Sequence, residues 1–236
     1  MDKNRKLADF MRAYGTIFAG IIIVIAFSIL SFDAFFTFGN FINITRQISI
    51  LVIIALGATL VMSVEEFDLS VGAMASLGGV VAARMAVSGM PMLLCFVFPV
   101  AICFVIGLLN GWIVTKFRVL SFITTLAMST IIGGFTFWFT GGATIFENIP
   151  RSFTFIGTKS LFRLPLLSLI MIFLTVLFWF VMRHTSFGRK LYAIGGNETA
   201  SQISGIPVTF HKNMAFALCA ALAALTGVLM ASRLGS

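Results

Sequence analysis

Long, nearly uncharged apolar runs recur along this chain and constrain its fold more than any other feature. Each run has roughly 17–25 residues, the length that a helix needs to cross about 30 Å of hydrocarbon. Hydrophobic residues make up 59% of the chain and charged residues 10%, which is too little charge for the surface of a soluble domain. A β-barrel would show short alternating segments instead. The sequence therefore predicts an all-α fold, a polytopic transmembrane helical bundle.

We expect about seven spans in a single transmembrane domain that covers residues 1–236. The first run is too long for a signal-peptide core, so we interpret it as an uncleaved span. If the N-terminus is cytoplasmic, ten of the 16 Lys and Arg residues lie on the cytoplasmic side, in accord with the positive-inside rule. This orientation depends on the third span, which is short and rich in Gly and Ala. The expected spans are residues 16–36, 48–64, 69–87, 92–114, 121–139, 164–182 and 213–232.

Small residues recur four positions apart inside several of these runs. Gly107 and Gly111 form one such pair, and others lie in the third and seventh spans. This spacing lets helix backbones approach closely in lipid, so we expect the third and seventh spans to be interior. The three cysteines also fall inside apolar runs and are interpreted as packing residues rather than disulfide or metal ligands; they are Cys95, Cys103 and Cys219.

Neither charge nor motifs indicate nucleic-acid binding or catalysis. The net charge of +8 arises from basic residues at the ends of apolar runs, where they control topology. The sequence has no phosphate-binding loop GxxxxGK[ST], no GxSxG and no HExxH, and we interpret His184 and His211 as interfacial residues. We therefore expect no enzyme activity, no cofactor and no metal site. The energy for any work must come from an ion gradient or from another polypeptide.

An acidic stretch at residues 65–72 interrupts the apolar sequence between the second and third spans. Asp68 is expected to cap the third span by accepting hydrogen bonds from its amides. Two interpretations of the stretch stay open: a solvated cytoplasmic turn, or a broken or re-entrant element that lines a passage. Asn110, inside the fourth span, is expected to form a helix–helix hydrogen bond. The candidate residues of a translocation pathway are Glu65, Glu66, Asp68, Ser70 and Asn110.

Two polar connections complete the predicted bundle. Residues 141–163 would lie outside, either as a docking surface for a partner or as a passive loop with interfacial aromatic residues. Residues 183–212 form the longest segment that is too polar for lipid. This segment would lie in the cytoplasm, and it is too long for a simple turn. We therefore interpret it as a surface that contacts another protein.

Five short strings, in this order, resemble those of the permease subunits of ribose/xylose/galactose-type ABC importers. They are FDLSVG at residues 67–72, LLNG at 108–111, GRKLYAIGGN at 188–197, SGI at 204–206 and ASRLGS at 231–236. The resemblance extends from the first span to the last residue. It implies further spans after residue 236, so we expect the sequence to be an incomplete permease.

The resemblance implies that residues 183–212 are a cytoplasmic coupling loop. Asn197 would cap a short coupling helix and Gly205 would end it before Pro207. The general importer signature is Glu-Ala-Ala followed by three residues and then Gly. The match to it is degenerate, because Thr199 stands at its second position and four residues, not three, separate Ala200 from Gly205. The residues implied to couple to the ATPase are Gly188, Arg189, Tyr192, Gly195, Gly196, Asn197, Glu198, Ala200 and Gly205.

The same resemblance implies a sugar importer of the bacterial inner membrane, surrounded by lipid. Its partners would be a cytoplasmic ABC ATPase, an extracytoplasmic sugar-binding protein and a second permease chain. Two other functions stay open on the residues alone. One is a gradient-driven secondary transporter or channel that uses Glu65, Glu66 and Asp68. The other is a non-transporting membrane assembly subunit.

Overall fold

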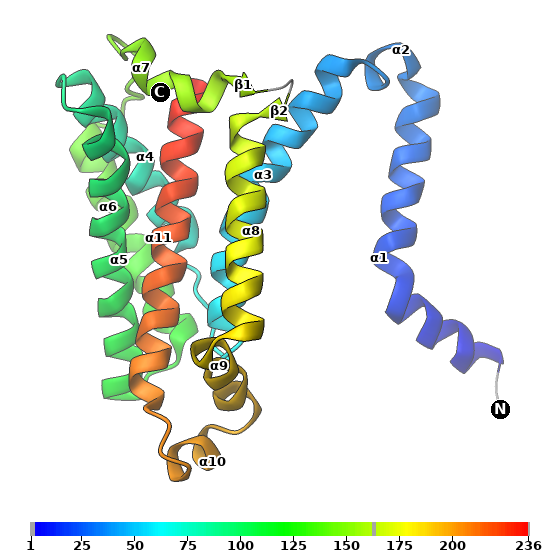
Figure 1. Ribbon diagram of the computed structural model, residues 1–236, viewed down its shortest axis with the longest axis vertical. Helices are drawn as coiled ribbons and strands as arrows, with labels where there is room; N and C mark the ends of the chain where they lie inside the picture. The colour runs from blue at the N-terminus through cyan, green and yellow to red at the C-terminus, as the bar shows by residue number, and fades with distance from the viewer. Residues whose placement is uncertain (1–2, 162–163, 236) are drawn as a thin grey trace. The chain divides into compact units, whose positions relative to one another are not determined.

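A computed structural model describes residues 3–161 and 164–235, which are almost entirely helical (Figure 1). The predicted all-α fold is confirmed. By its internal contacts the chain divides into two compact units, residues 1–45 and residues 46–236.

The first unit contains α1 (Lys3–Leu30), α2 (Phe32–Phe35) and the first turns of α3 (Phe38–Met62). The predicted first span is therefore two helices with a break at Ser31. The side chain of Thr37 accepts a hydrogen bond from the amide of Asn40 at 3.2 Å, so α3 begins ten residues before the predicted start of the second span. The sequence interpretation started the second span only after a group of polar residues, whereas α3 includes these residues without interruption.

The second unit contains the rest of α3 and all later elements. Its helices and its one antiparallel strand pair are α4 (Val71–Val87), α5 (Met92–Phe117), α6 (Ser121–Thr140), α7 (Arg151–Thr158), β1 (Ser160–Leu161), β2 (Leu164–Pro165), α8 (Leu166–His184), α9 (Ser186–Gly196), α10 (Glu198–Ile203) and α11 (Val208–Leu234).

Five of these helices are long and apolar enough to cross a membrane: α3, α5, α6, α8 and α11. Two shorter apolar segments, Tyr14–Leu30 and Val71–Val87, correspond to the predicted first and third spans. Within the second unit, α4 runs antiparallel to α5 and reaches the opposite end of the bundle (Figure 1). The weak third span therefore runs from one end of the bundle to the other, as the predicted orientation of the later spans requires.

The core of the second unit is built around α11, which is the most deeply buried of the five membrane-length helices. Helices α4 and α5 pack against it along most of its length. Its buried face is made largely of small side chains, among them Ala217, Ala220, Ala224 and Gly227. The prediction that the seventh span is interior is confirmed.

Glycines of the neighbouring helices allow this close packing. A Cβ at Gly107 of α5 would lie 2.6 Å from the carbonyl oxygen of Phe216, and one at Gly111 would lie 2.6 Å from the Cα of Asn213. A Cβ at Gly78 of α4 would lie 2.7 Å from the carbonyl oxygen of Ala224. The predicted GxxxG pair therefore packs on α11, and small residues serve backbone contact between helices here.

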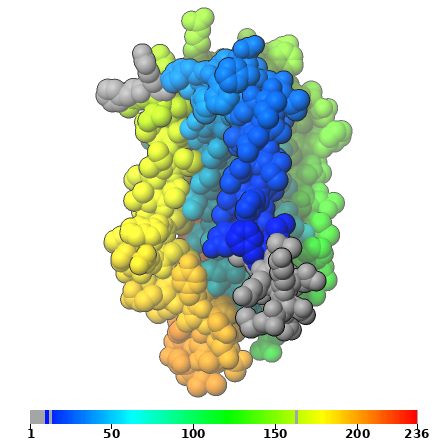
Figure 2. Space-filling model, turned by 90° about the vertical axis from the view of Figure 1, so that its right-hand side faces the viewer, coloured from blue at the N-terminus to red at the C-terminus, as the bar shows by residue number. Residues whose placement is uncertain are grey.

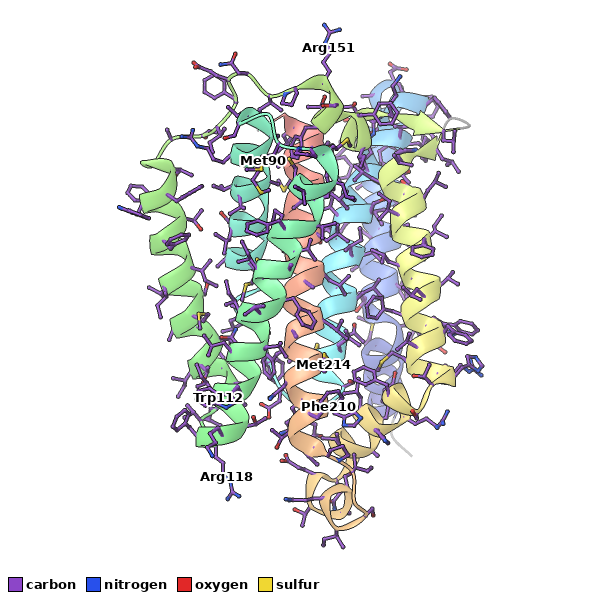
Figure 3. The ribbon with its side chains drawn as sticks, turned by 60° about the vertical axis from the view of Figure 1, so that its left-hand side comes forward. Met90, Trp112, Arg118, Arg151, Phe210 and Met214 are labelled. Atoms are coloured by element: carbon purple, nitrogen blue, oxygen red, sulfur yellow. The ribbon has the colours of Figure 1, made fainter. Side chains whose placement is uncertain are left out.

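The connections gather at the two ends of this unit. Met90 and Arg151 lie at one end, whereas Arg118 and Phe210 lie at the other with α9 and α10 (Figure 3). At the first end α7 packs on the last turns of α11, because the hydroxyl of Ser232 accepts from the amide of Gly157 at 2.9 Å and donates to the carbonyl of Phe153 at 2.6 Å. Phe153 is buried and Phe155 is exposed, so α7 packs one side on the bundle and leaves an aromatic residue on the other. Arg163, the last residue of that loop, lies outside the described residues.

Candidate functional site

The polar segment after α8 folds into two short helices, α9 and α10, with a side-chain cap on each. The hydroxyl of Thr185 accepts from the amide of Gly188 at the start of α9. The side-chain oxygen of Asn197 accepts from the amide of Ala200 at 2.9 Å and caps α10. Gly205 follows α10 with a φ of +79°, a conformation that glycine adopts without strain. The local structure expected around Asn197 and Gly205 is therefore present.

Helix α10 forms the tip of the second unit (orange in Figure 2). Its outer face carries Thr199, Ala200, Gln202 and Ile203, all exposed. Ile203 is 83% exposed, the largest value for a large apolar side chain in the described part of the chain. Ile203 is therefore the one large apolar side chain that the described outer face of α10 presents.

Helix α9 anchors this tip to the bundle. Leu191 and Ile194 are buried in the core cluster with the end of α3. Gly195 lies so close to the carbonyl of Ser63 that a Cβ there would collide with it. Tyr192 and Arg189 lie on the exposed side of α9. The predicted coupling residues thus divide into those that fix α9 on α3 and those that face outward.

The acidic stretch lies in the segment Ser63–Ser70, which connects α3 to α4 and which we call the α3–α4 loop. Its amides are held by side chains of α6: Phe67 donates to Ser121 at 3.1 Å, and Leu69 donates to Thr125 at 3.0 Å. These contacts tie the backbone of the loop to α6, while the side chains of Glu65, Phe67 and Leu69 stay exposed. The loop is a break between α3 and α4 in which protein side chains satisfy the amides of Phe67 and Leu69.

Asp68 does not cap α4 in the way the sequence indicated. Its Oδ1 accepts from the amide of Ser70 at 2.8 Å and from the Ser70 hydroxyl at 2.6 Å. Ser70, not Asp68, occupies the N-cap position of α4. The carboxylate therefore closes a turn in front of the helix and makes no bond to an amide inside α4. The N-cap prediction for Asp68 is wrong by two positions.

Asn110 of α5 hydrogen-bonds to the α3–α4 loop, at the N-cap residue of α4, instead of to another helix as predicted. Its Nδ2 donates to the hydroxyl of Ser70 at 3.2 Å, and both residues are fully buried. Within the described residues, Asp68 Oδ2 and Asn110 Oδ1 are buried without a hydrogen-bond partner, although the Cys219 thiol lies beside the carboxyl of Asp68. Burial raises the pKa of the Asp68 carboxyl, which lies outside both flanking helices, and hydrogen bonds from Ser70 oppose this shift.

Lys212 is the residue that the sequence interpretation missed. It lies in the second turn of α11, and its Nζ is 2.7 Å from Glu66 Oε1 and 2.7 Å from Glu198 Oε2. Its side chain is 9% exposed. The sequence showed Lys212 only as one more basic residue at a span end, because its two partners lie 146 and 14 positions away. His211 beside it is buried and is not the interfacial residue we expected.

The candidate pathway residues do not form one site. Asp68, Ser70 and Asn110 are joined by hydrogen bonds, Glu66 is paired with Lys212, and Glu65 is exposed on a backbone with a φ of 59°. Glu66 and Lys212 also line a polar cavity of about 530 Å³ next to α10. Nothing in the described part of the chain groups His, Cys, Asp or Glu in a way that would hold a metal ion.

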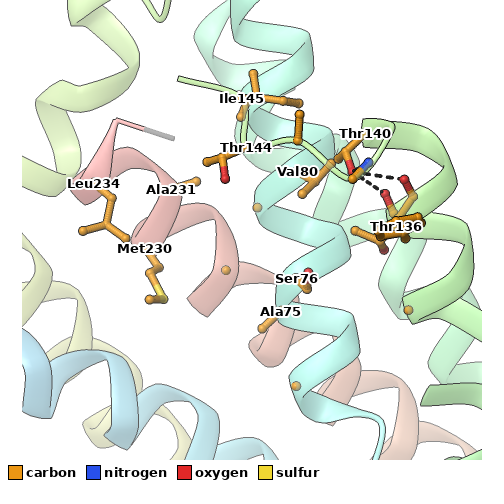
Figure 4. A pocket seen from close by; sticks show the side chains of 18 residues that line it. Ala75, Ser76, Val80, Thr136, Thr140, Thr144, Ile145, Met230, Ala231 and Leu234 are labelled. Atoms are coloured by element: carbon orange, nitrogen blue, oxygen red, sulfur yellow. Dashed lines mark hydrogen bonds between the residues drawn. The ribbon is translucent and has the colours of Figure 1, made fainter. Parts of the chain in front are cut away.

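A second cavity, of about 630 Å³, lies between α4, α6 and α11 (Figure 4). Ala75, Ser76 and Val80 of α4 face it, Thr136 and Thr140 of α6 line another side, and Met230 comes from α11. Ser76 and Gly72, which belong to the small-residue pattern of the third span, therefore face this cavity instead of another helix. Of the strings singled out in the sequence, two reach it: residues 67–72 through Gly72, and residues 231–236 through Ala231 and Leu234.

The hydrogen bonds of Asp68 yield a stability prediction. Asp68→Ala is expected to lower the free energy of unfolding by about 1–3 kcal/mol, because the buried amide and hydroxyl of Ser70 lose their acceptor. Asp68→Asn keeps an acceptor at Oδ1 and is expected to cost about 1 kcal/mol or less. Thermal unfolding of both variants in detergent measures the difference. Equal midpoints for the two variants would mean that the Ser70 contacts do not hold the α3–α4 loop.

Comparison with known proteins adds an independent line of evidence. Residues 40–236 match the family described as the branched-chain amino acid transport system / permease component. The ribose import permease RbsC of Haemophilus influenzae is 36% identical over 99% of this chain and 73% of its own length. The ribose import permease of Bacillus subtilis is 37% identical over 96% of the chain and 70% of its own length. The D-allose permease AlsC of Escherichia coli is 32% identical over 99% of the chain and 72% of its own length.

No solved structure matches the chain. The family match covers most of the residues, and the relatives exceed 30% identity over almost the whole chain. The helices of membrane length found in this chain accord with these matches. The chain therefore belongs to the permease components of bacterial ABC import systems, multi-pass proteins of the inner membrane.

Proposed function

We propose that this chain is the membrane-spanning subunit of an ATP-driven importer of a monosaccharide. The relatives are named for ribose and D-allose import, and a third group, 32% identical to this chain, is named for galactose import. These sugars share a small, uncharged, hydroxyl-rich form. The chain itself lacks a phosphate-binding loop, so ATP hydrolysis belongs to a separate ATPase subunit.

The observation that carries the proposal is the exposed, capped helix α10 at the tip of the unit. Its cap at Asn197 and the turn at Gly205 fix the helix, and Ile203 projects from it into solvent. A preformed helix with an apolar anchor binds a partner groove at a small entropic cost. We assign α10 to the surface that docks on the ATPase and α9 to its anchor on the bundle, on the cytoplasmic side that the charge distribution favours.

The proposal has two further partners. An extracytoplasmic sugar-binding protein would dock at the opposite end, where α7 packs on the last turns of α11. A second permease chain would complete the passage, as in importers of the type that this sequence resembles. A gradient-driven transporter is a weaker alternative, because Glu66 is paired with Lys212 and Asp68 is engaged by Ser70.

Ile203→Glu tests the docking assignment. The variant is expected to reduce copurification of the ATPase by about 30-fold, equivalent to the roughly 2 kcal/mol of an apolar anchor at an interface centre. Leu161→Glu is the matched control, because Leu161 is also apolar and exposed but lies in β1 at the other end. Unchanged ATPase copurification with Ile203→Glu would refute docking at α10.

Uptake measurements separate the two transport mechanisms. Proteoliposomes that contain this chain, its ATPase and its binding protein are expected to accumulate labelled ribose, D-allose or galactose. We expect this accumulation only when ATP is supplied on the side of the membrane where the ATPase lies. Accumulation driven by an ion gradient alone, without the ATPase, would favour the secondary transporter.

A further inference from the structure

Three segments that are distant in the sequence meet at the ammonium group of Lys212. Glu198 is the first residue of α10, Glu66 belongs to the α3–α4 loop, and Lys212 lies near the start of α11. Both carboxylate oxygens lie 2.7 Å from the same nitrogen. The proposed docking helix is therefore tied to the centre of the bundle through one buried side chain.

The two arms of this ion-pair network differ in exposure. The Glu198 side chain is 55% exposed, whereas those of Glu66 and Lys212 are 16% and 9% exposed. Glu198 adjoins the outer face of α10, so a protein that covers α10 touches the exposed arm. The inner arm ends in the α3–α4 loop, where the Glu66 side chain is largely buried.

The α3–α4 loop is in turn attached to α6 and α5. The residue after Glu66, Phe67, donates to Ser121 in the first turn of α6, and Leu69 donates to Thr125 one turn later. Ser70 accepts from Asn110 of α5. A shift of Glu66 therefore acts on the start of α6 and on α5 at Asn110, and α6 lines the cavity in Figure 4.

Separation of Lys212 from Glu66 would leave a largely buried carboxylate without its cation. A buried ion pair that loses one partner is far less stable than one that is intact or replaced completely. The three side chains are therefore expected to move together when α10 moves, with the distances from the Lys212 ammonium to the two carboxylates unchanged. A contact with this property gives two discrete arrangements, which is what coupling between distant sites requires.

We propose that Lys212 is the positioning residue that transmits displacement of α10 to the α3–α4 loop and through it to α5 and α6. The inference rests on the proposed function, because it takes the ATPase to be the protein that displaces α10. Beyond that function, the inference specifies a route from α10 to the α3–α4 loop through Glu198, Lys212 and Glu66. No other ion pair in the described part of the chain joins α10 to the bundle.

Lys212→Met tests the route in proteoliposomes that contain this chain, its ATPase and its sugar-binding protein. Three quantities are measured: copurification of the ATPase, ATP hydrolysis stimulated by the binding protein loaded with ribose, and ribose uptake. We expect the variant to retain the ATPase and to lose stimulated hydrolysis and uptake by at least about tenfold, equivalent to about 1.4 kcal/mol of lost coupling. Lys116→Met is the control, because Lys116 lies exposed in the last turn of α5 at the same end.

Two further variants separate transmission from a merely structural role. Lys212→Met with Glu66→Gln and Glu198→Gln removes the repulsion between carboxylates but also the link, and uptake is expected to stay low. Lys212→Glu with Glu198→Lys rebuilds a cation between two carboxylates, because the half-exposed position 198 has room for a longer side chain. This exchange is expected to recover at least half of the uptake.

The outcomes decide between the proposals. Wild-type uptake in Lys212→Met, full uptake in the neutral triple variant, or no recovery by the exchanged pair would each overturn the assignment of Lys212. A wild-type chain that fails to copurify the ATPase would overturn the proposed function instead. The two failures are therefore distinguishable in the same set of preparations.

Discussion

Replacement of Gly107 by leucine is expected to separate α5 from α11 and to lower the free energy of unfolding by on the order of 4 kcal/mol or more. A Cβ at Gly107 would lie 2.6 Å from the carbonyl oxygen of Phe216 and 2.8 Å from the Cα of Ala217. Both neighbours are backbone atoms of the most buried helix, so neither can move aside as the end of a flexible side chain would. The measurements are the yield of monodisperse protein and its thermal midpoint in detergent.

Gly134→Leu is the matched control for this substitution. Gly134 also lies inside a membrane-length helix, α6, but a Cβ there meets no atom within 4 Å. Its replacement removes a poor helix former, so a change of less than about 1 kcal/mol is expected, in the stabilising direction. If Gly107→Leu left the midpoint as high as Gly134→Leu does, α5 could not be packed on α11 through Gly107.

The contrast between these two glycines shows how far the sequence could predict packing. Both lie in apolar runs, and only the spacing of Gly107 and Gly111 singled out one of them. Spacing identifies a face on which small residues align, and the structure places that face on α11. The partner helix could not be read from the sequence, because Phe216 and Ala217 lie more than a hundred positions away in a run of similar composition.

The span boundaries were predictable where hydropathy changes abruptly. The predicted starts of the fourth and fifth spans, residues 92 and 121, coincide with the first residues of α5 and α6. The start of the second span was missed by ten residues, since α3 includes Asn43, Arg46 and Gln47. A helix satisfies its backbone whatever its side chains are, so hydropathy marks membrane depth better than it marks helix ends.

The candidate site was predictable only where its contacts are local. The cap at Asn197 and the turn at Gly205 depend on neighbours within a few residues, and the sequence indicated both. The partners of Glu66 and Asp68 depend on the fold, and the sequence could not assign them. It grouped Glu65, Glu66 and Asp68 as one acidic cluster, whereas the chain turns at Glu65 and gives the other two different partners, Lys212 for Glu66 and Ser70 for Asp68.

Gly195→Val is expected to displace α9 from the end of α3 and, with it, to weaken binding of the ATPase at α10 by more than about tenfold. A Cβ at Gly195 would collide with the carbonyl of Ser63 and would lie 3.5 Å from the Cα of Val64. Because Asn197 joins the two short helices and caps the second, a shift of α9 moves α10 as well. Overpacking of this contact costs about 1–3 kcal/mol, so the bundle around α11 is expected to remain folded. Copurification of the ATPase and the thermal midpoint of the purified chain measure the two effects separately.

Gly196→Val is the matched control, one residue further along the same helix. A Cβ at Gly196 meets no atom within 4 Å, so the same side chain enters solvent and ATPase binding is expected to stay within about twofold of wild type, a few tenths of a kcal/mol. A large difference between the two variants would mean that the contact of α9 with Ser63 positions the docking helix. Equal loss in both would place the ATPase contact on α9 itself, because a shared defect cannot arise from a contact that only Gly195 makes.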